Sequence, residues 1–543
     1  MKKFLKIIIP LVLIVIAGYI YYYVTLPAIN IHSPGFWFFI LIAFLVISTC
    51  VGFATANLDK KGRRLPGPMF KNKLFTISMG ITLALLAVYL IGSLLSSPIV
   101  NAGKYQQLLT ISERDFQEDI KEISYNEIPI LDKDSAALLG SRTMGSILEY
   151  VSQFEVSNNY TQINYQSAPT RVSPLRYGSF FKWLNNRSKG VPAYMKIDMA
   201  TQEVELVKLQ EGIKYSEAEH FGRNIYRYLR FHYPTYIFDT LNFEIDDEGT
   251  PYWICPVKDY TIGLFGGQTI GNVVIVNAIT GEHKDYKIDE VPQWVDRVYS
   301  AELLITLYDY YGTLKHGYWN SVISQKDSLQ TTDGYNYIAL EDDVWVYTGV
   351  TSVGGDESNV GFVLMNQRTA ETRYYSISGA EEYSAMASAE GKVQHLGYRA
   401  TFPLLLNIGG EPTYFIALKD AAGLVKNYAM VNISKYNIVA IGDTVNECEK
   451  KYLSALKSGG VTVLDTTNLP KITGTISKIA EGVIDGNSHY YILLNNSTEI
   501  FDVEVASYLS IIKYNVGDTI TLTYSQGAAV NTVVEVVEVV ELE

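Results

Sequence analysis

Charge is missing from the start of the chain. No Asp, Glu, Lys or Arg occurs between Ile7 and Leu58. Residues 1–100 hold nine Lys and Arg against one Asp, a net of +8, which leaves 35 basic and 56 acidic side chains, a net of −21, for the rest. A basic, apolar head on an acidic body is typical of a membrane anchor that carries a module in water. The acidic body lacks the clustered cations that neutralise phosphates, so we predict no nucleic-acid partner.

Cysteine is scarce as well, with three in 543 residues. Cys50 lies in the apolar head, which leaves only Cys255 and Cys448 for the body. This number excludes a disulfide framework. A single bridge between Cys255 and Cys448 stays open, although isolated buried thiols are the interpretation we favour.

Three apolar runs in the head are each long enough to cross a hydrocarbon core of ~30 Å as helices. They are Ile7–Val24, Phe36–Ala54 and Leu74–Val100. Six Lys and Arg lie in the connection between the second and third runs, and three Lys precede the first. The positive-inside rule places both in the cytoplasm, so we expect a multi-pass plasma-membrane protein whose amino terminus is cytoplasmic and whose body after about Val100 is extracytoplasmic.

A cleaved signal peptide followed by two spans is the competing interpretation of the same head. The bulky residues Tyr19–Tyr23 stand where a cleavage site needs small side chains, which disfavours cleavage. No charged side chain lies inside the runs, so they offer no ion or proton path. We therefore predict an anchor in contact with the lipid bilayer.

One sequence pattern, called the hairpin phrase below, occurs four times in the body: an apolar strand, an Asp or Asn, and a turn three or four residues later. The clearest copy is Val273–Lys287, a β-branched strand, a tight turn at Thr280-Gly281 and an alternating strand. The polar residue of this copy is Asn277, and the other copies place Asp198, Asn366 and Asn432 there. An internal repeat of this kind determines the architecture.

The segments between these hairpins indicate two units with the same order of elements. The first has a helix over Ser216–Arg230, capped by Ser216, before its closing hairpin. The second has a helix over Ala380–Gln394, and a further helix over Thr444–Leu456 follows it. The fold class we predict is a three-helix membrane anchor, an α+β extracytoplasmic body of duplicated helix and antiparallel-sheet units, and a small C-terminal β-barrel.

The predicted divisions follow from these patterns. Short strands of even spacing and the Gly517-Asp518 turn suggest the barrel, which resembles an OB-fold. The barrel has few basic residues, which favours packing or protein binding over nucleic-acid binding. The divisions are 1–100 for three transmembrane helices, 101–189 for a helical stalk and a segment without clear pattern, 190–290 for the first unit, 291–335 for a helical linker, 336–457 for the second unit and 468–543 for the barrel.

The repeated unit resembles the PepSY domain through its helix, strands and closing hairpin. The match is best at Val273–Glu282, weaker at Ile197–Glu203 and Val363–Glu371, and the copy at Asn432 lacks the Thr-Gly-Glu element. The resemblance implies tandem extracytoplasmic, non-catalytic α+β modules that take part in protein binding and regulation in the cell envelope. No catalytic residue comes with it.

Motifs that carry chemistry are few. The metalloprotease helix, the P-loop and the nucleophile elbow do not occur. Glu217 and His220 have a spacing that suits one helix face, but two ligands do not make a metal site. Ser454 and Lys457 have a Ser-x-x-Lys spacing without its companion motifs. We therefore predict no catalytic, cofactor-binding or metal-binding residue, and no cofactor.

Aromatic side chains crowd the segment around Pro234, which is the one candidate site. We interpret them first as core where a helix meets a sheet, and second as a groove for a protein partner. They are Tyr226, Tyr228, Phe231, Tyr233, Tyr236 and Phe238.

The sequence favours a membrane-anchored binding, scaffold or regulatory protein of the cell envelope. It would act through protein–protein contacts, with the bilayer and another envelope protein as its partners. The alternative is a membrane-bound cell-envelope hydrolase with dispersed catalytic residues. That alternative predicts a deep pocket with a perturbed carboxylate or histidine.

Overall fold

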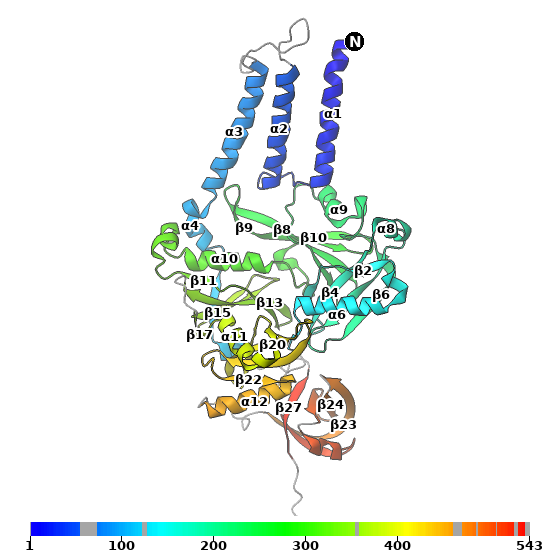
Figure 1. Ribbon diagram of the computed structural model, residues 1–543, viewed down its shortest axis with the longest axis vertical. Coiled ribbons are helices and arrows are strands. Elements are labelled where there is room, and N and C mark those ends of the chain that lie inside the picture. Colours follow the sequence, from blue (N-terminus) through cyan, green and yellow to red (C-terminus); the bar gives the residue numbers. More distant parts are fainter. Residues whose placement is uncertain are drawn as a thin grey trace, which may run out of the picture.

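The chain is extended along one axis, with three helices at one end and a small barrel at the other (Figure 1). A layered α+β body lies between them. The computed structural model describes residues 2–54, 73–121, 128–352, 358–459, 470–484, 487–505, 508–525 and 530–537.

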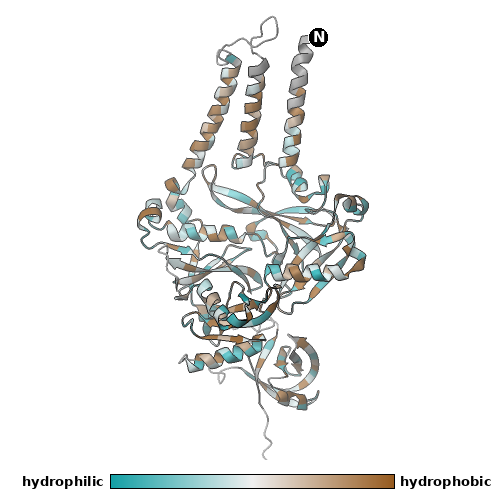
Figure 2. Ribbon diagram, viewed as in Figure 1, coloured by the Kyte–Doolittle hydropathy of each residue, from teal (hydrophilic) through white to brown (hydrophobic). Residues whose placement is uncertain are grey.

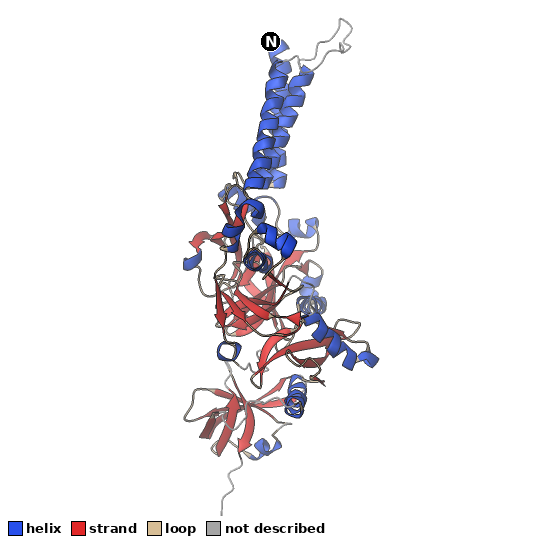
Figure 3. Cartoon of the chain, turned by 90° about the vertical axis from the view of Figure 1, so that its left-hand side faces the viewer, coloured by secondary structure: helices blue, strands red, loops and turns tan. Residues whose placement is uncertain are grey.

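The amino-terminal helices are α1 (Lys2–Thr25), α2 (Pro34–Ala54) and α3 (Lys73–Leu95). They run side by side away from the body, as both views of the chain show (Figures 1 and 3), and the coloured parts of α2 and α3 are mostly hydrophobic (Figure 2). Within the described part of the chain, one helix is long and apolar enough to cross a membrane, Phe75–Leu95, with a mean hydropathy of 2.1. A shorter apolar stretch is Pro34–Cys50.

The body is built from four copies of one unit, a four-stranded antiparallel meander. The first meander is β3 (Thr161–Tyr165), β4 (Ala168–Tyr177), β5 (Val191–Asp198) and β6 (Val204–Ile213). The second is β7 (Asn242–Ile245), β8 (Pro251–Ile262), β9 (Gly266–Asn277) and β10 (His283–Lys287). The third is β12 (Asn336–Leu340), β13 (Asp343–Ser352), β15 (Gly361–Asn366) and β16 (Thr372–Tyr375). The fourth is β19 (Leu404–Ile408), β20 (Glu411–Lys419), β21 (Val425–Asn432) and β22 (Val439–Gly442).

A helix precedes each meander, so the repeating unit is a helix followed by four strands. These helices are α6 (Lys133–Ser146), α9 (Ile225–His232), α10 (Ala301–Thr313) and α11 (Glu382–Lys392), and α12 (Val445–Ser458) follows the fourth meander. Short strands extend the sheets: β1 (Ile111–Arg114), β2 (Phe154–Val156), β11 (Leu329–Thr331) and β18 (Arg399–Ala400). The smaller elements include α4 (Pro98–Gln106), α5 (Phe116–Asp119), α7 (Leu148–Val151), α8 (Phe180–Asn186) and the pair β14 (Ser358–Asn359) and β17 (Gly379–Ala380).

The recurrent Asp or Asn stands at the turn between the third and fourth strand of every meander. In the second meander the Asn277 Oδ1 accepts hydrogen bonds from the backbone N–H groups of Ile279 and Thr280, at 2.9 and 3.0 Å. Gly281 then takes a left-handed conformation, with φ +79°. A short side chain with an acceptor oxygen can satisfy these turn amides, which explains why Asp and Asn recur.

The first and third meanders repeat these bonds without the glycine. Asp198 and Asn366 each accept from two turn amides at 2.8–2.9 Å. The left-handed position is Gln202 in the first, with φ +63°, and Ala370 in the third, with φ +62°. In the fourth meander the Asn432 Oδ1 accepts from one turn amide, the N–H of Lys435, at 2.7 Å, and its Nδ2 donates to Glu411 and Tyr452. The hairpin is therefore specified by the acceptor more than by the glycine.

The two middle meanders are covered on both faces. Along β9, Val274 and Val276 belong to the core shared with the first meander, whereas Val273 and Ile275 face α10 and the third meander. Successive side chains of a strand point to opposite faces. A strand that is buried on both faces needs a continuous apolar run. This explains why β9 contains the clearest copy of the hairpin phrase.

The sheets divide the chain differently from the predicted boundaries. Strands β4 and β5 pair across residue 190, so the segment without clear pattern supplies three strands of the first sheet. Residues 111–114 of the predicted helical stalk are strand β1, which pairs in parallel with β16. Each Asp or Asn hairpin closes its own meander, which makes four copies instead of two.

Among the predicted helices, two are confirmed and one is wrong in part. Helix α11 lies within Ala380–Gln394, and α12 is capped by Thr444, whose hydroxyl accepts from the Glu447 N–H. The helix expected from Ser216 begins only at Ile225, where Asn224 is the cap. The residues before it bond to the second meander: the N–H groups of Lys214 and Tyr215 both donate to the Ala278 carbonyl at 3.0 Å.

The C-terminal barrel is a closed sheet of five strands with its own core. Its order is β23-β24-β25-β27-β26, with β25 and β27 parallel and the remaining pairs antiparallel. Ile492, Phe501 and Leu522 are fully buried inside. The strands are β23 (Lys471–Ile484), β24 (Asn487–Leu494), β25 (Ile500–Glu504), β26 (Thr519–Ser525) and β27 (Asn531–Val537).

Candidate functional site at the junction of helices and body

Helix α9 carries the aromatic segment and has two different faces. Ile225 and Leu229 are buried in the core between the first two meanders. Tyr226 and Phe231 face outward and are 46% and 47% exposed. The helix therefore presents aromatic rings away from the sheet that it covers.

The six candidate aromatics divide accordingly. Four of them, from the far side of α9 and the loop after it, pack against the buried core, as the core interpretation predicts. These four are Tyr228, Tyr233, Tyr236 and Phe238. The structure places Phe231 against the end of α1, a contact that no sequence pattern indicated.

The end of α1 lies on this segment through rings and hydrogen bonds. The ring of Phe231 lies 6.1 Å from that of Tyr22, edge to face, and 6.2 Å from that of Tyr23. The guanidinium of Arg227 lies over the Tyr23 ring at 4.2 Å, a cation–π contact. The N–H of Ile29 donates to the Pro234 carbonyl at 2.8 Å.

Arg230 organises the loop that follows α9. Its Nε donates to the Leu26 carbonyl at 2.9 Å, and its Nη1 donates to the carbonyls of Tyr233, Pro234 and Tyr236 at 2.7–3.2 Å. Burial lowers the pKa of this guanidinium. One side chain thus satisfies four carbonyls and ties the loop to α1.

Beneath the loop, tyrosine hydroxyls bond to the last hairpin of the second meander. Tyr236 donates to the Asp285 carboxylate at 2.6 Å, and this bond raises the pKa of Tyr236 to about 12. The Tyr228 hydroxyl donates to the Gly281 carbonyl at 2.7 Å and lies 2.9 Å from the His283 Nδ1. The site is therefore continuous with the repeated hairpin.

The other two helices contact the tip of the β8–β9 hairpin. The Ser96 Oγ accepts from the N–H groups of Leu264 and Phe265, at 2.8 and 3.2 Å. The ring of Phe265 lies 5.2 Å from Tyr89 of α3 and 6.3 Å from Trp37 of α2. The second unit, α9 together with its meander, therefore contacts all three helices.

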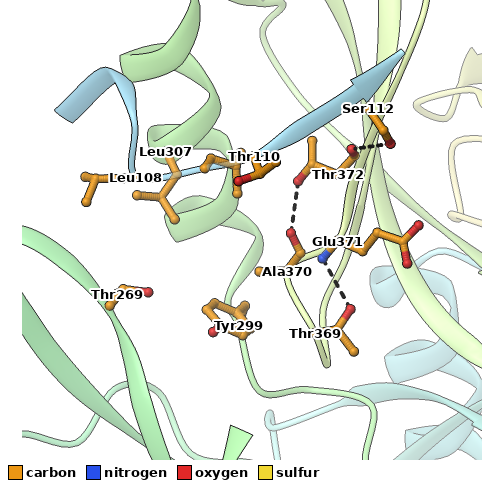
Figure 4. A pocket seen from close by; sticks show the side chains of 11 residues that line it. Leu108, Thr110, Ser112, Thr269, Tyr299, Leu307, Thr369, Ala370, Glu371 and Thr372 are labelled. Carbon is orange, nitrogen blue, oxygen red and sulfur yellow. Dashed lines mark hydrogen bonds between the residues drawn. The ribbon is translucent and has the colours of Figure 1, made fainter. Parts of the chain in front are cut away.

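A cavity of about 570 Å³ opens between β9, α10, β1 and the β15–β16 turn (Figure 4). Its walls are apolar side chains and threonine or serine hydroxyls that mostly bond the backbone, such as the Ser112 Oγ donating to the Thr372 carbonyl at 3.1 Å. The carboxylate of Glu371 lies at its rim and pairs with the Arg373 Nε at 2.8 Å. This lining pairs no nucleophile with a base.

A smaller cavity of about 320 Å³ contains the pair considered for a metal. His220 lies against the rings of Phe180 and Trp183, at 5.2 and 4.6 Å, while Glu217 accepts a 2.6 Å bond from the Tyr226 hydroxyl. The prediction that Glu217 and His220 share one helix face is wrong, because both residues precede α9, which begins at Ile225. Within the described ranges, no three His, Cys, Asp or Glu side chains come close enough to hold a metal.

Two buried carboxylates join the first three meanders. Glu244 is 0% exposed and accepts from the N–H groups of Asp296 and Arg297 at 2.9 and 3.0 Å. Asp296 is 1% exposed and accepts from the N–H groups of Asn164 and Val344 at 2.7 and 3.2 Å. Burial raises the pKa of Glu244 to about 7 and also raises that of Asp296. A perturbed carboxylate is present, then, but it is enclosed and bonded to backbone.

The cysteines occupy separate cores. Cys255 lies between the first two meanders, whereas Cys448 belongs to α12 and lies in the core of the fourth meander, and both are buried free thiols. Burial raises the pKa of each thiol.

Comparison with known proteins does not assign the chain to a family. No protein-family description matches the chain, and no curated protein matches it. A crystal structure of an ACO/RPE65 chimera is similar at 9% identity and a TM-score of 0.15, over 72% of this chain and 66% of the chimera. A likeness at that level carries no argument.

Proposed function

We propose that this protein is a membrane-anchored, extracytoplasmic binding or scaffold protein of the cell envelope. The observation that carries the proposal is the junction: three apolar helices leave one side of the body, and the second unit, which is α9 with its meander, contacts each of them. Such contacts set the body against a bilayer at a fixed orientation. The three helices are the anchor in this proposal.

The order of the helices supports the orientation. The amino terminus, the end of α2 and the start of α3 all lie at the end away from the body (Figure 1). The chain between α2 and α3 carries Lys60, Lys61, Arg63 and Arg64. Under the positive-inside rule, that end faces the cytoplasm and the body lies outside.

The repeat supports binding rather than chemistry. Four helix-plus-meander units stand in series where the sequence predicts two, and we propose that they are PepSY-like modules; the five-stranded closed barrel supports the proposed OB-like resemblance. Tandem modules expose extended surfaces on which a second envelope protein can bind. Tyr228, Tyr233, Tyr236 and Phe238 are committed to the core, so the partner surface we propose lies outside these four.

Protease added to intact cells tests the orientation. We expect cleavage in the body and none in the basic connection between α2 and α3 until the cells are opened. A cytoplasmic protein in the same cells is the control for integrity. A body that resists protease in intact cells and is cleaved in lysates contradicts the proposal.

Crosslinking on those cells tests the binding role. We expect one envelope protein to be recovered with the full chain, and recovery to survive detergent extraction. Turnover of a peptide or glycan by the purified full chain would support the hydrolase instead.

A further inference from the structure

A basic and aromatic surface adjoins the end of α1. Two segments form it, Phe180–Lys189 with α8, and His220–Tyr233 with α9. They touch where the rings of Trp183 and Phe221 lie 5.8 Å apart and where the Arg223 Nη1 donates to the Arg187 carbonyl at 2.8 Å. We call this region the α8–α9 surface.

The charge of this surface is opposite to that of the body. The two segments contain no Asp or Glu, although the chain beyond residue 100 has a net charge of −21. Two glutamates lie just before the second segment, and both are bonded: Glu217 accepts from the Tyr226 hydroxyl, and the buried Glu219 accepts from the Tyr177 hydroxyl and the Trp183 Nε1. The six cations are Lys182, Arg187, Lys189, Arg223, Arg227 and Arg230. An acidic body is repelled by anionic surfaces unless it presents a local basic face, which this one does.

Large apolar side chains are exposed among these cations. Phe181 is 74% exposed and Phe221 is 59% exposed, with Phe180 and Leu184 also exposed beside them. The rings are in mutual contact, with centroids 6.0 Å apart for Phe180 and Phe181. Single exposed apolar side chains are ordinary, but a contiguous group marks a surface that another phase or molecule covers.

The position of the surface indicates what covers it. Its own helix α9 contacts Tyr22 and Tyr23 of α1, so the surface starts where that helix leaves the proposed membrane. Figure 1 shows α8 and α9 on the helix end of the body. Aromatic rings and cations together are the composition that settles at a bilayer interface, rings toward the acyl chains and cations toward anionic headgroups.

We propose that the α8–α9 surface lies on the outer face of the membrane and binds anionic phospholipid, with Phe180, Phe181 and Phe221 reaching the acyl boundary. Arg187, Lys189 and Arg223, which are exposed, contact the headgroups. Arg227 and Arg230 hold the surface to α1 instead. The inference rests on the proposed membrane anchor, and it adds a lipid class that the anchor does not require.

Lipid-borne quenching of a fluorophore on the full chain tests this contact. Cys50→Ser removes the exposed thiol and leaves two buried ones, so that Phe181→Cys can be labelled alone. The protein is placed in nanodiscs of phosphatidylcholine, with or without phosphatidylglycerol, whose acyl chains carry bromine. The same label at Val516→Cys, 61% exposed on the barrel, is the matched control.

We expect strong quenching at position 181 in discs with phosphatidylglycerol, weaker quenching in neutral discs, and none at position 516. Arg187→Gln, Lys189→Gln and Arg223→Gln together should abolish the excess in anionic discs. Removing three exposed cations elsewhere, with Lys392→Gln, Arg399→Gln and Lys457→Gln, should leave it unchanged.

Two failures can be told apart. If the chain enters the discs but position 181 is as unquenched as position 516, or is quenched equally in both lipids, the anionic-lipid surface is overturned and the anchor stands. If the chain does not enter the discs at all, the anchor fails and the lipid surface fails with it.

Discussion

The body has two kinds of joint, and they differ in what fills them. Between the meanders, Glu244 and Asp296 are sealed from water and bond only to backbone N–H groups. Between the body and the helices, Arg230 and Ser96 bond carbonyls and amides and are also buried, at 8% and 2% exposed, but the ring of Phe231, which contacts Tyr22, is 47% exposed. When one partner of a hydrogen bond is removed from a sealed joint, the other partner stays buried without a hydrogen bond, because water cannot reach it. A joint at a membrane surface instead needs side chains that suit both water and lipid.

The largest loss of stability is expected when Asp296 is removed. Asp296→Ala leaves the N–H groups of Asn164 and Val344 buried and unsatisfied, at a cost on the order of 4 kcal/mol in the free energy of unfolding. Urea unfolding of the full chain in detergent measures the loss. Asp289→Ala, at an exposed carboxylate, is the control and should change little. A loss at Asp296 no larger than at Asp289 would show that the sealed joint does not hold the meanders.

The second prediction concerns the joint between the meanders, where the buried Glu244 makes stability depend on pH. Burial raises the pKa of Glu244 from 4.5 to about 7 in the folded protein. Between these two values the folded state keeps a proton that the unfolded state has lost, so the free energy of unfolding falls as the pH rises from 4.5 to 7. The fall is on the order of 3 kcal/mol.

Urea midpoints measured across this range test the sign, with Glu244→Gln as the comparison. The substitution should make the profile shallower, because glutamine does not titrate, and the fall that remains belongs to Asp296, whose pKa burial also raises. A parent protein that becomes steadily more stable from pH 4.5 to 7 is the outcome that contradicts a protonated buried Glu244.

At the outer joint the largest effect is expected at Arg230. Arg230→Lys keeps the charge but cannot reach four carbonyls from one planar group, so about 2 kcal/mol of stability should be lost. The loop after α9 should also become a site of limited proteolysis. Arg223→Lys on the same surface is the control, since that guanidinium makes one carbonyl bond and is exposed. Equal proteolysis of the two variants would mean that the loop is held by something else.

The two joints also differ in how far the sequence predicts them. The hairpin phrase predicts the turn at Asn277 correctly, because the Asp or Asn acceptor acts within four residues. It does not predict that Glu244 and Asp296 meet, since their partners Asn164 and Val344 lie far away in the chain. Nothing in the alternation of β7 distinguishes a buried glutamate from an exposed one.

The predicted start of the helix at Ser216 is wrong for a related reason. Ser216 has the residue type of a cap, but the backbone after Ile213 is held extended by the Ala278 carbonyl, so the helix cannot start there. The aromatic segment is found from its composition, and most of it is core, as expected. Its contact with Tyr22 and Tyr23 depends on α1 reaching the body two hundred residues before α9 in the chain, which no local pattern shows.

The smallest expected effect compares two tyrosines of the outer joint. Tyr236→Phe removes a 2.6 Å bond to the Asp285 Oδ2, and about 1 kcal/mol should be lost. The other oxygen of this carboxylate, Oδ1, accepts from the Asn272 Nδ2 at 3.1 Å and so ties the pair to the second meander. Tyr226→Phe removes a bond of equal length to Glu217, but that ring is 46% exposed, so water replaces the partner and the loss should be smaller. Thermal unfolding of both variants in the same detergent measures the difference. A larger loss at Tyr226 would mean that exposure does not decide what a tyrosine contributes at this joint, and that its outward face is already covered by something other than water.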